Sequence, residues 1–138
     1  MATWGGKDET SSKERASRRL LRRVVVQGHG LNVDLSFGDA TLAAALSDVS
    51  GGGCCLRIVL SPFEETAVPV VGAVVTVLLP TGTHPLSCSG RVVSVVTDGG
   101  VGYVEAHIRF QGLTIDQRGR LQGWLAWLAR RRFATRSE

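Results

Sequence analysis

Residues 102–111 read Gly-Tyr-Val-Glu-Ala-His-Ile-Arg-Phe-Gln, and their order of apolar and polar side chains indicates the fold class. Apolar residues occupy every second position from 104 to 110, while a glutamate, a histidine and an arginine stand between them. Successive side chains of a β-strand point to opposite faces, so this period of two predicts a strand with one buried and one solvent-facing side.

Segments of the same kind recur along the chain between turn-forming glycine, proline and aspartate residues. We expect strands at residues 24–26, 31–37, 41–47, 53–60, 73–79, 87–96 and 102–111. The segment 41–47 is ambiguous, because its run of leucine and alanine also has good helix propensity. Glycine makes up 17 of the 138 residues, above its usual share of about 7%, and this too favours a turn-rich β protein.

The C-terminal part of the chain has a different period. Leu121, Trp124, Leu125 and Leu128 recur at the i, i+3, i+4, i+7 spacing of an amphipathic helix. Such a helix needs an apolar surface, and the open end or side of a small barrel is its natural partner. The sequence therefore predicts a mostly β domain in which several short antiparallel strands close on themselves and pack against a final helix.

The chain is basic, and its basic residues are nearly all arginine. It carries a net charge of +4 with a pI of about 9.5, and 14 of its 16 basic residues are arginine. Two clusters lie near the ends, at Arg15, Arg18, Arg19, Arg22 and Arg23, and at Arg130, Arg131, Arg132 and Arg136. Arginine binds phosphate and the edge of guanine with two parallel hydrogen bonds, so these clusters predict an anionic partner: a nucleotide, a nucleic acid or a membrane surface. The alternative is a charge that only keeps the two ends solvated.

Several other classes of function lack support in the sequence. Cys54, Cys55 and Cys88 have no C-x-x-C spacing and the histidines are scattered, so neither a zinc site nor a disulfide framework is predicted. Ser50 has no readable histidine-based activation, and we expect no catalytic residues, no metal and no cofactor. Residues 66–90 contain no charged side chain, yet prolines and glycines interrupt them, so no membrane span is expected.

The first candidate binding motif is R-x-x-x-R, which occurs in two overlapping registers. The pairs are Arg18 with Arg22 and Arg19 with Arg23. Two arginines at this spacing can bind a small dianion from both sides. The alternative is a basic, solvated arm, because such a match is common in an arginine-rich chain.

The second candidate motif is D-x-S-x-x-G, formed by Asp48, Ser50 and Gly53. A carboxylate can accept hydrogen bonds from N1 and N2 of guanine, a serine hydroxyl adds another bond, and glycine lets a ligand approach the backbone. The alternative is an ordinary turn between two strands. A similar stretch, Asp34–Gly38, has its glycine one residue too early and reads as the interior of a strand.

Taken in this order, with Arg23 and Asp48 separated by 25 positions, the two motifs resemble the PilZ domain, a family of bacterial receptors for the second messenger cyclic di-GMP. The resemblance covers about residues 18–129. It implies a six-stranded antiparallel PilZ-type β-barrel with a C-terminal α-helix and a flexible basic N-terminal arm. The expected boundaries are a flexible polar segment at 1–17, the barrel domain with its helix at 18–132 and a tail at 133–138.

The resemblance also implies the ligand-binding residues. They are Arg18, Arg19, Arg22, Arg23, Asp48, Ser50 and Gly53. The arginines would bind phosphates and stack on or bond to guanine, the aspartate and serine would read a guanine edge, and the glycine would permit close contact. Arg19 and Arg23 are the preferred pair, because Arg23 directly precedes a strand as in the family, but the overlapping registers leave open which pair leads.

The leading functional hypothesis is a non-enzymatic cyclic di-GMP receptor whose arm becomes ordered on binding. The ordered arm would signal to a downstream protein partner or to a covalently linked effector domain. The expected setting is the bacterial cytoplasm, or the cytoplasmic part of a larger membrane protein, with no DNA partner. Two alternatives stay open: a PilZ-like adaptor that binds no ligand, and a small basic β-barrel that binds single-stranded nucleic acid.

Overall fold

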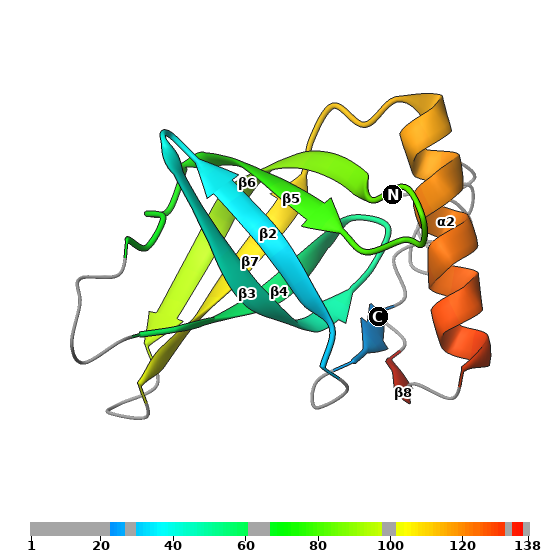
Figure 1. Ribbon diagram of the computed structural model, residues 1–138, viewed down its shortest axis with the longest axis horizontal. Helices are drawn as coiled ribbons and strands as arrows, with labels where there is room; N and C mark the ends of the chain where they lie inside the picture. Colours follow the sequence, from blue (N-terminus) through cyan, green and yellow to red (C-terminus); the bar gives the residue numbers. More distant parts are fainter. Residues whose placement is uncertain (1–22, 27–29, 61–66, 98–101, 132–133, 137–138) are drawn as a thin grey trace, which may run out of the picture.

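Eight strands and one helix make up the described part of the chain. The computed structural model describes residues 23–26, 30–60, 67–97, 102–131 and 134–136 (Figure 1). The strands are β1 (Arg23–Val25), β2 (Asn32–Phe37), β3 (Ala40–Val49), β4 (Gly53–Val59), β5 (Val74–Leu79), β6 (Leu86–Thr97), β7 (Tyr103–Phe110) and β8 (Ala134–Arg136). The helix α2 spans Ile115–Arg130, between β7 and β8.

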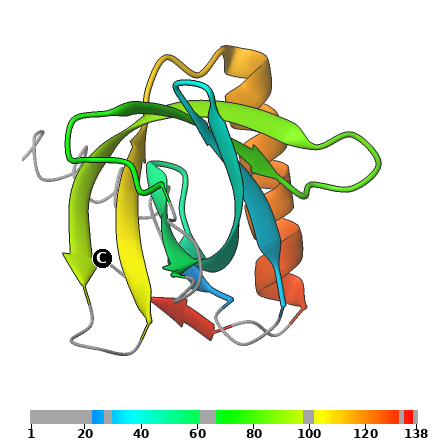
Figure 2. The ribbon, with the colours of Figure 1, turned by 60° about the vertical axis from the view of Figure 1, so that its left-hand side comes forward.

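Six of the strands close into an antiparallel barrel. The order around the ring is β2-β5-β6-β7-β4-β3, and β3 pairs back with β2 to close it. Figure 2 shows the strands curving around a common interior. Closure removes the unpaired edges that an open sheet would expose. The barrel and the final helix expected from the sequence are therefore confirmed, as is a strand over the ambiguous residues 41–47.

The long strand β3 is shared by two neighbours along one of its edges. Ala40–Ala45 pair with β2, whereas Asp48 and Val49 pair with β1. Strand β8 then pairs with β1 on the far side from β3. The sequence did not predict β8, and it predicted that the strand of β3 would end at residue 47. Pairing with β1 carries the strand on to Val49, so Asp48 lies in a strand and the turn begins later.

One apolar core fills the barrel and continues beneath the helix. Inward-facing residues of the barrel, Leu56 and Ile58 among them, are fully buried. The four apolar residues of the predicted helix stripe belong to the same buried cluster, so α2 covers the barrel. The helix begins at a capping box, in which Thr114 and Gln117 each accept a hydrogen bond from the other's backbone N–H. Within the described ranges, no helix is both long and apolar enough to span a membrane.

Strands β4 and β7 approach each other closely at Gly53. A Cβ atom on Gly53 would overlap the backbone carbonyl group of Ile108, so no larger residue fits without movement of a strand. A Cβ on Gly123, in the middle of α2, would meet open space instead. The glycine that ends the D-x-S-x-x-G motif thus has a packing reason that is independent of any ligand.

This contrast predicts opposite effects of two chemically identical substitutions. We expect Gly53→Ala to lower the free energy of unfolding by about 1–3 kcal/mol, because the added methyl group is overpacked against backbone. Gly123→Ala should raise it by up to about 1 kcal/mol, because alanine is the better helix former. Urea denaturation followed by circular dichroism measures both values. A Gly53→Ala variant as stable as the parent would contradict the close approach of β4 and β7.

Candidate functional site

An extra residue in β3 turns the side chain of Asp48 to the outer surface of the barrel. Pairing with β4 shifts by one position between Leu46 and Asp48, which leaves Ser47 as a β-bulge. Under strict alternation Asp48 would point inward like Leu46, which is 2% exposed. The bulge reverses this, so Val49 enters the core and Asp48 faces outward. The carbonyl oxygen of Ser47 accepts a hydrogen bond from the N–H of Val26 at 2.9 Å, which ties the bulge to the end of β1.

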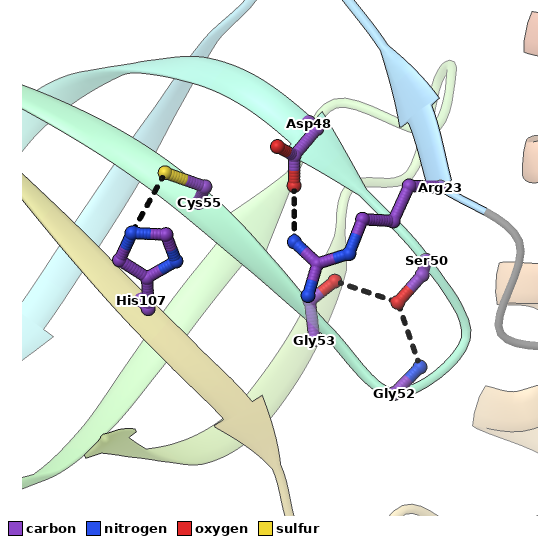
Figure 3. A network of polar contacts seen from close by, with 7 residues as sticks. All are labelled: Arg23, Asp48, Ser50, Gly52, Gly53, Cys55 and His107. Carbon is purple, nitrogen blue, oxygen red and sulfur yellow. Dashed lines mark hydrogen bonds and ion pairs between the residues drawn. The ribbon is translucent and has the colours of Figure 1, made fainter. Parts of the chain in front are cut away.

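An ion pair joins the two sequence motifs at this point. Nη1 of Arg23 lies 3.2 Å from Oδ1 of Asp48 (Figure 3). The contact forms because β1 pairs with the last residues of β3. The two side chains are 38% and 13% exposed. Solvent therefore reaches the guanidinium more than the carboxylate, and the pair lies at the margin between the core and the surface.

Ser50 holds the turn between β3 and β4. Its backbone N–H donates to the carbonyl oxygen of Gly53 at 2.8 Å. Its Oγ accepts from the N–H of Gly52 at 3.2 Å and donates to the carbonyl oxygen of Gly53 at 3.4 Å (Figure 3). With Ser50 only 7% exposed, its hydroxyl serves to stabilise the turn in this structure.

A surface cavity of about 670 Å³ opens beside Arg23 and the Ser50 turn. The backbone of the turn forms one part of its wall, and His107 and Arg109 of β7 form another. Small-molecule sites commonly have volumes of roughly 300–1,000 Å³, so the cavity has a suitable size. The combination of a cationic side chain, a partly exposed glycine backbone and a nearby carboxylate suits a ligand with both phosphate and base groups.

The wall formed by β7 adds positive charge to the cavity. Arg109 pairs in register with Gly53 on β4 and with Arg91 on β6, which sets two arginines directly opposite each other. Like charges in such a position repel, and an anion between or beside them relieves the repulsion. Arg109 is exposed and makes no hydrogen bond or ion pair anywhere in the chain as described. It is therefore available to an anionic ligand.

A second polar group crosses the outer face of the barrel next to Asp48. Asp48, Cys55 and His107 are successive cross-strand partners on β3, β4 and β7. Sγ of Cys55 lies 3.7 Å from Nε2 of His107, and the Glu105 carboxylate lies close enough that all three ligand atoms fall within 4.8 Å of one another (Figure 3 shows the first two). Burial, followed by the charges of Asp48 and Glu105, raises the pKa of the Cys55 thiol to about 12, although nearby arginines oppose the rise. These three side chains are of types that bind metal ions.

The structure describes four of the seven predicted binding residues. Arg23, Asp48, Ser50 and Gly53 gather at one site, and all but Asp48 line the cavity. The other three, Arg18, Arg19 and Arg22, lie outside the described residues. Which of the two arginine pairs makes the main ligand contacts therefore stays a prediction.

Two residues at the site, His107 and Arg109, were not among the predicted binding residues. Their alternation within residues 102–111 placed them on the polar face of a strand, which the structure confirms. Their position beside the Ser50 turn depends on β7 pairing with β4, although more than forty residues separate these strands in sequence. Strand order of this kind follows from closure of the barrel and leaves no local signal.

Known proteins share both the sequence pattern and the fold. The family model of the PilZ domain matches residues 14–127. A comparison with curated proteins gave no match. The PilZ domain of YcgR from Escherichia coli, solved with c-di-GMP, is 20% identical, with a TM-score of 0.60 and coverage of 79% of this chain and 89% of that one.

Two longer proteins also contain this fold. PlzA of Borreliella burgdorferi, solved in complex with c-di-GMP, is 12% identical, with a TM-score of 0.53 and coverage of 85% of this chain and 45% of its own. The Bacillus subtilis inhibitor of motility (MotI/DgrA) is 14% identical, with a TM-score of 0.53 and coverage of 74% and 48%. The chain thus spans about half the length of these two proteins. With the family model matching most of the sequence and a six-stranded barrel under a C-terminal helix, the chain belongs to the PilZ domain family.

Proposed function

We propose that this chain is a non-enzymatic receptor for cyclic di-GMP. The observation that carries the proposal is the convergence of Arg23, Asp48 and the Ser50–Gly53 turn at one cavity of about 670 Å³. Cyclic di-GMP offers two phosphates and two guanines, and this site offers cations for the former and a carboxylate for the latter. Solved structures of YcgR and PlzA, which share the fold, contain c-di-GMP.

Binding would exchange one set of partners for another. The Arg23 guanidinium would leave the Asp48 carboxylate for a phosphate oxygen or a guanine edge, where an arginine can make two parallel hydrogen bonds. The carboxylate would accept instead from N1 and N2 of guanine. Arg23 and Asp48 would each keep hydrogen-bond partners in both states, so the exchange leaves neither side chain without a partner.

The remaining arginines of the R-x-x-x-R motifs would complete the site from the other side. Chain connectivity keeps Arg19 within roughly 14 Å of Arg23, because extended chain advances at most about 3.6 Å per residue. The side chain of Arg19 can therefore reach a ligand that contacts Arg23. Ordering of this arm on the ligand would change the surface around the cavity, which a downstream protein partner or a linked effector domain would then recognise.

Removal of Arg23 or Asp48 tests the proposed contacts directly. We expect Arg23→Ala and Asp48→Asn each to weaken cyclic di-GMP binding by about 10- to 100-fold, since a hydrogen bond to a charged group contributes about 1.5–3 kcal/mol. Isothermal titration calorimetry gives the affinity and the number of ligands bound, with GMP and GTP as specificity controls.

The chain provides matched controls for both variants. Asp34→Asn removes an exposed carboxylate from the similar Asp34–Gly38 stretch of β2, and Arg120→Ala removes an arginine whose hydrogen bonds go to Thr81 and His84. Both should bind like the parent. A folded parent chain that binds no cyclic di-GMP would refute the receptor proposal and favour the adaptor or nucleic-acid hypotheses. Full affinity in Arg23→Ala and Asp48→Asn would refute the assigned contacts.

Arg109 provides a separate test of the cavity wall. We expect Arg109→Ala to weaken cyclic di-GMP binding and to reduce its salt dependence, because one cation that faces the ligand phosphates is lost. Its cross-strand neighbour is the control, since Arg91 donates to the carbonyl oxygen of Gly72 at 2.7 Å and does not line the cavity. Affinity titrations at several salt concentrations compare the two variants. Equal effects of Arg109→Ala and Arg91→Ala on affinity would indicate that the arginines act through the general electrostatic field rather than that Arg109 contacts the ligand.

A further inference from the structure

Three side chains of metal-ligand type lie together on the outward-facing side of the barrel, where the cysteine is buried and the other two are half-buried. Cys55 on β4 lies directly opposite His107 on β7, and Glu105 precedes His107 by two positions on the same face of β7. Because both strands belong to the closed barrel, the backbone holds these residues at fixed spacing. Cys54, by contrast, points into the apolar core.

The separation of the cysteine and histidine matches one edge of a zinc tetrahedron. With Zn–S near 2.3 Å and Zn–N near 2.0–2.1 Å, tetrahedral geometry requires the sulfur and nitrogen to be about 3.6 Å apart. In this structure Sγ of Cys55 and Nε2 of His107 are 3.7 Å apart. All three ligand atoms, the Glu105 carboxylate included, lie within 4.8 Å of one another. Rotation of the flexible Glu105 side chain can shorten the distances from its carboxylate to the other two atoms.

No other described group engages the Glu105 carboxylate. Its cross-strand partner Arg57 places its guanidinium over the ring of Tyr103, 4.4 Å from the ring centroid, rather than in an ion pair with it. Across the ranges that the structure covers, Glu105 makes no hydrogen bond and no ion pair. A half-buried carboxylate without a partner beside a thiol and an imidazole is an arrangement that a bound cation would satisfy.

We propose that Cys55, Glu105 and His107 bind one Zn²⁺ ion, with an external ligand such as water in the fourth position. A mixed set of sulfur, nitrogen and oxygen ligands suits Zn²⁺, whereas Ca²⁺ and Mg²⁺ take oxygen ligands. On binding, the S–H bond of Cys55 breaks, the proton passes to solvent and a Zn–S bond forms. Near this thiol the charges of Asp48 and Glu105 favour a bound cation, whereas those of Arg23 and Arg57 oppose it.

This site is distinct from the proposed cyclic di-GMP contacts and does not depend on them. His107 nevertheless lines the cavity as well, so a metal on its Nε2 would lie at the edge of that cavity. The two sites can be tested separately, because metal binding is measured without nucleotide.

Two measurements on the purified full chain test the proposal. In competition with a chromophoric zinc chelator, the parent should remove a single Zn²⁺ per chain from the dye. With Co²⁺ as a spectroscopic substitute, it should show a thiolate-to-cobalt charge-transfer band and the intense visible bands of tetrahedral Co²⁺. Cys55→Ser should lose the charge-transfer band, and Glu105→Gln and His107→Gln should each weaken Zn²⁺ binding by more than the roughly 10- to 100-fold that loss of an outer-shell partner costs.

Matched variants carry the same or equivalent chemical changes elsewhere. Cys88→Ser, His84→Gln and Asp116→Asn alter residues outside the cluster, and they should retain Zn²⁺ binding as long as circular dichroism shows them folded. Should Cys55→Ser fail to fold, the charge-transfer band of the parent and the two β7 variants still decide the matter. No stoichiometric Zn²⁺ binding by the parent, or binding that survives both Glu105→Gln and His107→Gln, would overturn the proposal.

Discussion

The β-bulge at Ser47 is the constraint on which the candidate site depends. The core demands an apolar side chain at both Leu46 and Val49, and a regular strand cannot direct two residues three positions apart to the same face. One extra residue resolves this conflict and sends Asp48 outward. The hydrogen bond from Val26 to the bulged residue also anchors β1, and β1 is what brings Arg23 to Asp48. The packing of the core thus determines the position of the ion pair.

The residues that stabilise the fold and those proposed to bind the ligand are in different parts of the molecule. The closed barrel and the buried face of α2 supply a single apolar core, whereas the Arg23–Asp48 pair lies at its partly exposed margin. An ion pair in that position keeps two charges compensated and oriented outside the apolar core. The proposed exchange of this pair for a ligand would leave the core packing unchanged. Ser50 is the opposite case, since its buried hydroxyl maintains the turn and a ligand would gain from the shape of that turn more than from the serine itself.

Local pattern was enough to predict the fold class, and long-range pairing accounts for what it missed. The alternation in residues 102–111 and the spacing of Leu121 and Leu128 both reflect burial on one face. Both patterns can therefore be recognised from the sequence alone. Strand β8 has only three residues, and it forms because β1 has an unpaired edge. The residues near β8 in sequence do not indicate that edge. Likewise, the bulge at Ser47 and the approach of His107 to Cys55 follow from which strands lie side by side. The two motifs were visible in the sequence, but only the resemblance to a family predicted that they come together at one site.

The strand register places two of the proposed metal ligands and the wall of the cavity in adjacent rows across the barrel. One row runs from Asp48 through Cys55 to His107, and the next passes from Gly53 to Arg109 and Arg91. Side chains two positions apart on a strand point to the same face and are separated by about 6.5–7 Å, so the rows are neighbours. A metal held in the first row would add positive charge beside the cavity wall and would fix the orientation of His107. By linkage, any effect of that metal on ligand affinity must be matched by an equal effect of the ligand on metal affinity, so a coupling through the shared histidine would act in both directions.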